Sequence, residues 1–279
     1  MMKTVEIKTN EGYRVSAHIY EIPDSKNILI ISSATGVKQS YYKKFAQFLS
    51  DHGVSVITFD YLGIGESLKK PIQKLNNGAS DWGKTDLHAV TEYTKKNYPD
   101  QNIILLGHSI GGQLIGLSSS STEAGKIILV AAQSGYWKFW KGFQKYKLWT
   151  YWKAMFPLLI NFFNYLPSKR ISGMENLPKN VAKQWGKWCL SPNYLFDHIP
   201  KQDLFFKNIT TPLISVSIED DHFAPRKAVD WLSKKYESAD LTRIHLVPKD
   251  FNTDTIGHFG IFREQFKDNI WPLFLREII

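Results

Sequence analysis

The chain has 279 residues, 43% of them hydrophobic, with a formal net charge of +9 and a single cysteine. This length and composition can supply the core of one large domain or two small ones, and they exclude disordered and fibrous architectures. No apolar run approaches the ~18 residues of a membrane span, and the alternating start of the chain does not resemble a signal peptide. Because the lone Cys189 has no partner for an internal disulfide, we expect a cytoplasmic protein.

Short β-rich runs alternate with longer amphipathic stretches, which is the pattern of a mostly parallel sheet flanked by helices. Residues 4–9 and 13–20 alternate around Asn10-Glu11-Gly12 and predict an opening hairpin. Six further strands are predicted at 27–32, 54–59, 103–106, 126–131, 213–218 and 242–247. Helices are predicted at 41–51, 86–97 with Asp86 as the N-cap, 110–119, 226–236, and from about Arg263 to the C-terminus.

Residues 134–207 form a separate compositional unit. They contain 12 Lys or Arg against three acids, 19 of the 39 aromatic residues and six of the nine tryptophans. The rest of the chain has 23 basic and 23 acidic residues, so the whole net charge lies in this segment. An insertion after the sixth strand stands over the carboxyl edge of the sheet, where open α/β folds bind ligands. We therefore predict a cap (lid) at 134–207 on a core domain of residues 1–133 and 208–279.

The start of this segment has the pattern of a basic amphipathic helix over residues 136–146. One face would present Lys138, Lys141 and Lys145, and the other Phe139, Trp140, Phe143 and Tyr146. Such a helix suits weak contact with an anionic membrane or a gate over an acyl pocket, but packing of the aromatic stripe onto the domain beneath is the favoured interpretation. No nucleic-acid partner, metal or cofactor is expected, because no run of Lys or Arg exceeds two residues and no metal-ligand motif is present.

The segment Gly107-His108-Ser109-Ile110-Gly111 follows a predicted buried strand and opens a predicted helix. This is the pattern of a nucleophile elbow, in which a sharp turn pushes a serine hydroxyl outward. The turn needs small residues because larger ones at 107 and 111 would clash. Ser109 is therefore the candidate nucleophile, and a glycine-rich turn whose serine only caps the helix is the alternative.

A serine nucleophile needs a base, and the base needs an acid to orient it. In proteins with a nucleophile elbow of this kind, the acid and then the histidine follow the serine along the chain. Three carboxylates at 219–221 follow the strand 213–218. We choose Asp221, which lies four residues before Pro225, with Asp220 as the alternative. His258 is the candidate base, because it is the only histidine left downstream of the acid.

An oxyanion needs two backbone N–H donors. The first is expected from Ile110, directly after the serine and at the start of a helix. The second is expected from the loop after strand 27–32, where Thr35 is the better candidate and Gly36 the alternative. An ordinary turn at 33–36 explains that loop equally well.

Taken together, these residues resemble the α/β-hydrolase superfamily over residues 28–131 and 213–275. The chain further resembles a bacterial group known only as predicted α/β hydrolases. That resemblance is carried by Ala34-Thr35-Gly36-Val37, Phe59-Asp60-Tyr61 with Gly63-Ile64-Gly65, Gly107 to Gln113, Glu219-Asp220-Asp221 with Ala224-Pro225, and Gly257-His258-Phe259-Gly260.

Two positions depart from the superfamily pattern. Ser33-Ala34 stands where most members have His-Gly, and this puts the second oxyanion donor in doubt. Leu62 stands where an arginine is common in the loop after Asp60. Asp60 itself is expected to hold that loop through hydrogen bonds to backbone N–H groups.

We expect a cofactor-independent serine hydrolase of carboxylic esters or thioesters, with Ser109, His258 and Asp221 as its catalytic triad. Acyl transfer on the same scaffold and a non-catalytic binding protein that retained the fold are the alternatives. The composition of the cap predicts an apolar pocket with a basic mouth, which suits medium-chain acyl esters or acyl groups on anionic carriers. The sequence makes no prediction of the oligomeric state.

Overall fold

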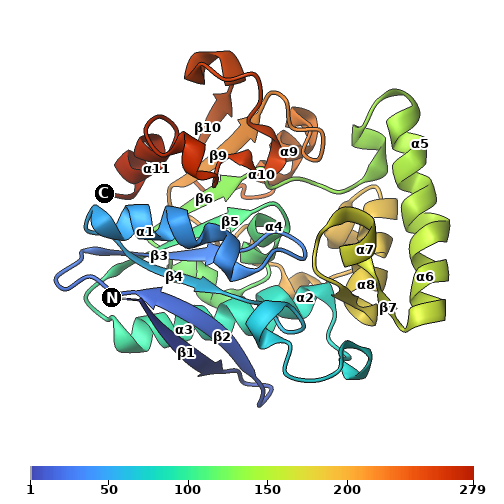
Figure 1. Ribbon diagram of the computed structural model, residues 1–279, viewed down its shortest axis with the longest axis horizontal. Helices are drawn as coiled ribbons and strands as arrows, with labels where there is room; N and C mark the ends of the chain where they lie inside the picture. The colour runs from blue at the N-terminus through green and yellow to red at the C-terminus, as the bar shows by residue number, and fades with distance from the viewer. Residues whose placement is uncertain (1) are drawn as a thin grey trace.

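The computed structural model describes residues 2–279, which are built around one eight-stranded sheet (Figure 1). In spatial order the strands are β1 Met2–Lys8, β2 Arg14–Tyr20, β4 Ser55–Phe59, β3 Asn27–Ser32, β5 Asn102–His108, β6 Lys126–Val130, β9 Leu213–Ile218 and β10 Leu241–Leu246. β2 pairs antiparallel with β1 and β4, and the remaining neighbours pair parallel. The predicted mostly parallel sheet is confirmed, with strand ends within one or two residues of those expected.

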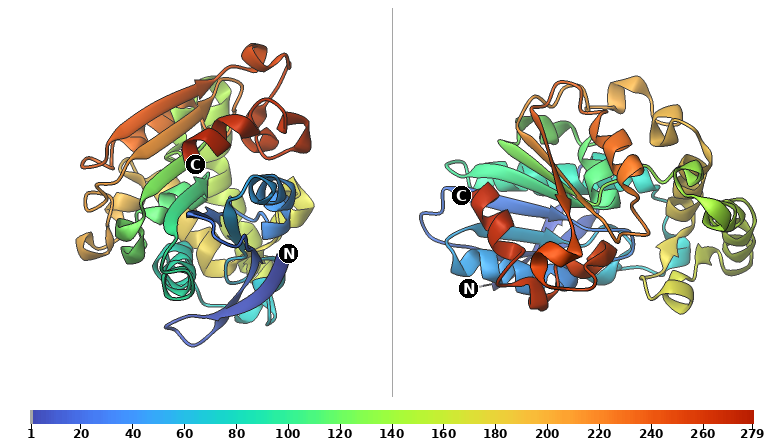
Figure 2. Two further views of the ribbon diagram at one scale, coloured as in Figure 1. Left: turned by 90° about the vertical axis from the view of Figure 1, so that its left-hand side faces the viewer. Right: turned by 90° about the horizontal axis from the view of Figure 1, so that it is seen from above.

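The sheet is buried on both faces. Side chains alternate between the two faces along its central strands, and apolar residues occupy both sets of positions. In β3, Ile28 and Ile30 point into one apolar cluster and Leu29 and Ile31 into the other. α1 and α11 supply residues to the second cluster, whereas α3 and α4 supply the first, so helices cover both faces (Figure 2). The helices of this core are α1 Lys43–Asp51, α2 Ala79–Asp81, α3 His88–Asn97, α4 Ile110–Ile115, α9 Arg226–Ser233, α10 Gly257–Gly260 and α11 Trp271–Ile278.

The segment between β6 and β9 gathers at one end of the sheet, on the right in Figure 1. Its elements are α5 Gly142–Thr150, α6 Phe156–Phe163, β7 Tyr165–Leu166, α7 Ser168–Ser172, β8 Leu177–Pro178 and α8 Lys179–Leu190. A π-helical turn at 151–155 joins α5 to α6. Trp152, Ile160 and Trp188 belong to the same apolar cluster as Ile28. The role of 134–207 as a cap stays a prediction.

The helix predicted to begin at Asp86 begins earlier, at Ala79, and runs through a π-helical turn at 82–87 into α3. The prediction that Asp86 is an N-cap is therefore wrong. Its buried carboxylate instead accepts hydrogen bonds from the Tyr13 hydroxyl at 2.5 Å and the Leu62 N–H at 2.8 Å. Burial raises the pKa of Asp86 to about 7.

The C-terminal helix begins at Trp271 and not near Arg263. Only a short 3₁₀ turn, Glu264–Phe266, lies between them. Pro272 explains the difference, because a proline inside a longer helix would remove one hydrogen bond and clash with the preceding turn. At the second position of α11 the same residue is tolerated.

The single amphipathic helix predicted over 136–146 is broken. A short turn at Trp137–Phe139 is followed by extended backbone at Trp140 and Lys141, and α5 begins at Gly142 with a φ of +57°. The Trp140 indole donates a hydrogen bond to the carbonyl of His222 at 2.8 Å, which holds the extended stretch against the core.

The prediction that the aromatic stripe packs onto the core is correct for Trp140, which is 8% exposed, and wrong for Phe143 and Tyr146. Phe143 is 81% exposed and Tyr146 is 54% exposed. Both lie in α5, beyond the break, on a face largely open to solvent, where the ring centroid of Trp137 lies 6.3 Å from that of Tyr146. Across residues 2–279 no helix is long and apolar enough to cross a membrane.

The close approach of α4 to β3 can be tested with a matched pair of glycine substitutions. A Cβ at Gly111 would lie 2.0 Å from the backbone oxygen of Ser32, whereas a Cβ at Gly186 in α8 would meet nothing closer than 3.8 Å. We expect Gly111→Ala to lower the free energy of unfolding by about 3 kcal/mol or more through overpacking. Gly186→Ala should raise it by about 0.5 to 1 kcal/mol. Urea denaturation measures both, and an equal effect would contradict the tight packing.

Candidate active site

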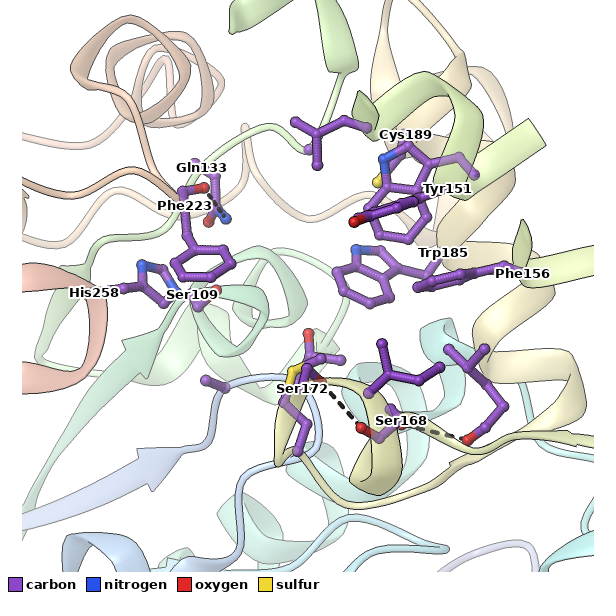
Figure 3. Close-up of a pocket in the computed structure, with 18 of the residues that line it drawn as sticks. Ser109, Gln133, Tyr151, Phe156, Ser168, Ser172, Trp185, Cys189, Phe223 and His258 are labelled. Atoms are coloured by element: carbon purple, nitrogen blue, oxygen red, sulfur yellow. Dashed lines mark hydrogen bonds between the residues drawn. The ribbon is translucent and has the colours of Figure 1, made fainter. Parts of the chain in front are cut away.

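Ser109 occupies a one-residue turn between β5, which ends at His108, and α4, which begins at Ile110. Its backbone has φ 54° and ψ −118°, a combination that side-chain-bearing residues rarely adopt and that is found at functional sites. The Ser109 N–H donates to the carbonyl of Val130 at 2.9 Å, which ties the turn to β6. The side chain lines a cavity and lies beside the ring of His258 (Figure 3).

Asp221 lies in the loop after β9 and His258 in the short helix α10, which follows β10, and the two side chains meet at this turn. His258 Nδ1 lies 2.7 Å from Asp221 Oδ2, and both side chains are almost completely buried. The other oxygen of Asp221 accepts the N–H groups of Phe223 at 2.8 Å and Ala224 at 2.9 Å. Because the carboxylate can only accept, Nδ1 carries the proton and Nε2 is left as a proton acceptor.

Within the described residues, no hydrogen bond joins Ser109 Oγ to the His258 ring. Such contacts are often loose without a ligand and tighten when substrate binds. The arrangement can therefore take a proton from a serine hydroxyl once a bound substrate brings the two groups together.

Asp220, the alternative acid, does not contact the imidazole. Its carboxylate accepts the Thr255 hydroxyl at 2.6 Å and the N–H groups of Ile256 at 3.0 Å and Gly257 at 3.1 Å. Burial alone would raise the pKa of Asp220, but these hydrogen bonds outweigh it and the pKa is lowered. Asp220 therefore holds the backbone that precedes His258, while Asp221 holds the ring.

Of the two predicted oxyanion donors, Thr35 lines the cavity and Ile110 directly follows the cavity-lining Ser109. Ile110 is the first residue of α4, and Gly36 is not among the cavity-lining residues. The neighbouring Ala34 N–H is already used, since it donates to the Tyr42 hydroxyl at 3.0 Å. Gly36 turns its carbonyl toward the N–H of Glu175 at 2.8 Å. Thr35 keeps its place ahead of Gly36, and its role stays a prediction.

Asp60 has the role expected from the sequence. Its carboxylate accepts the N–H of Gln39 at 2.7 Å and the N–H of Glu66 at 2.8 Å. It thereby connects the loop after β4 to the turn before α1, which follows the loop of Thr35 in sequence.

A buried chain of hydrogen bonds, which was not predicted from the sequence, lies behind the site. Tyr42 Oη lies 2.8 Å from His108 Nδ1, and His108 Nε2 lies 3.0 Å from the backbone oxygen of His258. Together with the bond from Ala34 to Tyr42, the chain links the loop of Thr35 to the backbone of His258. The feature of the sequence that could have predicted this chain is His108, because a histidine buried at the end of a strand requires polar partners for its two ring nitrogens.

The protons in this chain can be assigned. The backbone oxygen of His258 only accepts, so His108 Nε2 carries the proton and Nδ1 accepts from the Tyr42 hydroxyl. Burial, together with the nearby His258, holds the pKa of His108 well below its usual range. His108 is therefore neutral and is held in one tautomer.

The cavity has a volume of about 230 Å³, and its wall is mainly apolar. Large side chains from the segment between β6 and β9 form much of this wall: Leu148, Tyr151, Trp152, Met155, Phe156, Leu166, Ile171, Met174 and Trp185. Among the described residues no Lys, Arg, Asp or Glu lines it, as the predicted apolar pocket requires, and the basic mouth stays a prediction. Lys138, Lys141 and Lys145 lie on the stretch that leads into α5 and in α5 itself. No group of His, Cys, Asp and Glu in residues 2–279 could hold a metal ion.

Residues 23–183 match the protein family described as Serine aminopeptidase, S33. The chain belongs to this family of α/β hydrolases. It is therefore a serine α/β-hydrolase enzyme, as the sequence motifs predict.

Similar proteins include both peptidases and esterases. The proline iminopeptidase of Saccharolobus solfataricus is 28% identical over 120 residues, which cover 40% of this chain and only 37% of that protein. The Pyrococcus furiosus esterase Pf2001 has a TM-score of 0.63 at 19% identity, covering 100% of this chain and 91% of its own. A carboxyl esterase from Bacillus coagulans has a TM-score of 0.65 at 12% identity, covering 100% and 99%. At these identities the solved structures establish the fold.

The hydrogen-bond chain behind the site can be tested with two tyrosine substitutions. Tyr42→Phe leaves the buried Ala34 N–H and His108 Nδ1 without partners, so we expect a loss of about 1 to 3 kcal/mol in stability. We also expect a lower kcat at an unchanged KM, because the hydrogen bonds that link the loop of Thr35 to the backbone of His258 are broken. Tyr20→Phe is the control, since the buried Tyr20 hydroxyl has no partner within the described chain and its removal should be neutral or stabilising. Equal effects in the two variants would contradict the role of the chain.

Proposed function

We propose that this enzyme hydrolyses carboxylic esters, with thioesters as related substrates, through Ser109, His258 and Asp221. The observation that carries the proposal is the 2.7 Å hydrogen bond from His258 to buried Asp221, formed beside a serine on a strained turn. This is the geometry by which a base is oriented toward a serine nucleophile. The single buried Cys189 is consistent with the proposed cytoplasmic location.

In the proposed reaction, Ser109 Oγ forms a bond to the acyl carbon while His258 Nε2 accepts the hydroxyl proton. The negative charge that develops on the acyl oxygen is bound by the N–H groups of Ile110 and Thr35. The bond to the leaving alcohol or thiol then breaks, and His258 returns the proton to that group. Water attacks the acyl-enzyme in the same way and releases the acid. Asp221 stabilises the imidazolium in both halves and is not itself protonated.

The cavity wall favours esters over substrates with a free amino terminus. An ammonium group needs a carboxylate partner when buried, because an unpaired charge is expensive in an apolar site. Within the described residues none lines the cavity. A separate hollow that shares Phe223 and His258 contains Asp220 and Asp254, but Asp220 is already occupied by the loop before His258. The family description therefore does not by itself assign peptidase activity here.

The triad assignment predicts a graded set of losses. Ser109→Ala should abolish labelling by a fluorophosphonate probe and lower kcat by about 10⁴-fold to 10⁶-fold. Asp221→Asn should lower kcat by about 10⁴-fold, because an amide favours the wrong imidazole tautomer. Asp220→Asn is the matched control and should lose far less activity. Peptide mapping of the label and ester hydrolysis measure these effects.

Each outcome that contradicts the assignment points to a different error. An unchanged rate in Ser109→Ala would refute the serine mechanism. A larger loss in Asp220→Asn than in Asp221→Asn would show that the acid is misassigned. Products formed with an added alcohol in place of water would identify acyl transfer, which shares the first half of the reaction.

The cavity predicts a dependence on acyl chain length. For a series of p-nitrophenyl esters, kcat/KM should rise by roughly fourfold per methylene until the cavity is full. Leu148→Trp, which fills the cavity, should shift the optimum to shorter chains. Leu148 lies in α5, and the control is Leu158→Trp in the adjoining α6, at a position that is 71% exposed and should leave the optimum unchanged. A flat chain-length profile in the wild type would contradict an acyl-binding cavity.

A further inference from the structure

The helix from Gly142 to Phe163, formed by α5, the π-helical turn and α6, has two apolar faces. Its inner face contributes to the cavity wall with Leu148, Tyr151, Trp152, Met155 and Phe156. Its outer face is exposed at Phe143 (81%), Tyr146 (54%), Trp149 (41%), Leu158 (71%) and Phe162 (81%). α5 and α6 stand at the outer edge of the molecule, away from the sheet (Figures 1 and 2). Large apolar side chains gathered on such an edge mark an interaction surface.

The segment that carries this outer face has only positive charge. No acidic residue occurs from Ser134 to Met174, whereas the stretch from 138 to 153 contains Lys138, Lys141, Lys145, Lys147 and Lys153. Within the described chain none of these lysines forms an ion pair. Lys138, Lys145 and Lys147 lie over aromatic rings. No carboxylate of the described chain therefore neutralises these ammonium groups, and an external anion can do so.

We propose that the outer face of the helix 142–163 docks onto the surface of an anionic lipid bilayer. Exposed Phe, Trp and Leu side chains can enter the boundary between headgroups and acyl chains, while lysines on the same helix contact lipid phosphates. The helix then lies in the plane of the membrane surface. Docking of this kind needs no spanning segment.

Charge complementarity favours lipid over a second copy of this chain. Two copies that meet through this face would bring two sets of unpaired lysines together, and like charges across an interface oppose association. An anionic bilayer supplies both an apolar layer for the aromatic side chains and phosphates for the lysines.

Docking would also place the cavity close to lipid, because the inner face of the same helix lines it. Ile171 in α7 is both 51% exposed and part of the cavity wall, so the wall of the cavity reaches the surface at that residue. This consequence rests on the proposed ester hydrolysis, since it assigns the substrate to apolar esters that partition into membranes. The docking itself does not depend on it.

Cosedimentation with vesicles tests the docking directly. The full-length chain should bind vesicles of equal parts phosphatidylglycerol and phosphatidylcholine, and it should bind pure phosphatidylcholine far more weakly. Binding should weaken as salt rises from about 10 to about 150 mM, because the Debye length shrinks from roughly 30 to 8 Å. Ser109→Ala should bind like the wild type, so a failure of hydrolysis and a failure of docking are distinguishable.

Two double variants separate the charge from the apolar contribution. Lys145→Gln with Lys147→Gln should lower the partition coefficient roughly thirtyfold, at about fivefold per lysine. The control removes the same charge elsewhere, at exposed Lys8 and Lys26, and should change binding little. Phe143→Ser with Phe162→Ser should lower binding by at least about tenfold, while Leu68→Ser, at another exposed position, should not.

Hydrolysis of a water-soluble short-chain ester should be unchanged in both double variants, which shows that they are folded. Absence of vesicle binding, or equal binding by the wild type and the Phe143→Ser, Phe162→Ser variant, would overturn the proposal. So would a concentration-dependent dimer in sedimentation velocity that this variant abolishes, because the face would then be covered by a second copy.

Discussion

The site depends on how closely α4 approaches the sheet. The chain reverses within one residue after β5, and this is possible only because Gly107, Gly111 and Gly112 carry no side chains. A Cβ at Gly107 would lie 2.4 Å from Gly112, and one at Gly111 would lie 2.0 Å from the Ser32 oxygen. This packing supports the strained backbone of Ser109, and it also sets the start of α4 beside the loop after β3.

The segments after β9 and β10 complete the site. The first supplies two neighbouring carboxylates, and the second supplies His258 and the backbone before it. Asp221 turns toward the imidazole of His258, and Asp220 turns toward the backbone that carries it. Behind them, Tyr42 and His108 connect the loop after β3 to the same backbone. Four segments that are far apart in the sequence are thus held by buried hydrogen bonds, which are unfavourable to break because each leaves a polar group without water.

The segment after β6 connects this site to the surface. The helix 142–163 supplies apolar side chains to the cavity on one side and exposes others on the opposite side. Because its charge is only positive, its exterior differs from the balanced surface of the rest of the chain. None of these lysines lines the cavity next to the candidate triad. The basic composition of the segment therefore belongs to its outer surface and not to the cavity wall.

The sequence by itself predicted the eight strands, their mostly parallel arrangement and Ser109 as the candidate nucleophile, because glycine spacing and buried apolar runs are local properties. The order of the strands in the sheet came only from the structure. The spacing to Pro225 also placed Asp221 ahead of Asp220 as the candidate acid. Only the tertiary structure shows that Asp221 contacts the His258 ring and Asp220 the backbone before it, since adjacent residues in a loop point in directions that depend on what packs around them. The buried position of Asp86, the break at Trp140 and the exposure of Phe143 were likewise decided by long-range contacts. The hydrogen bond from Tyr42 to His108 joins residues 66 positions apart, and a single sequence carries no signal for such a pairing.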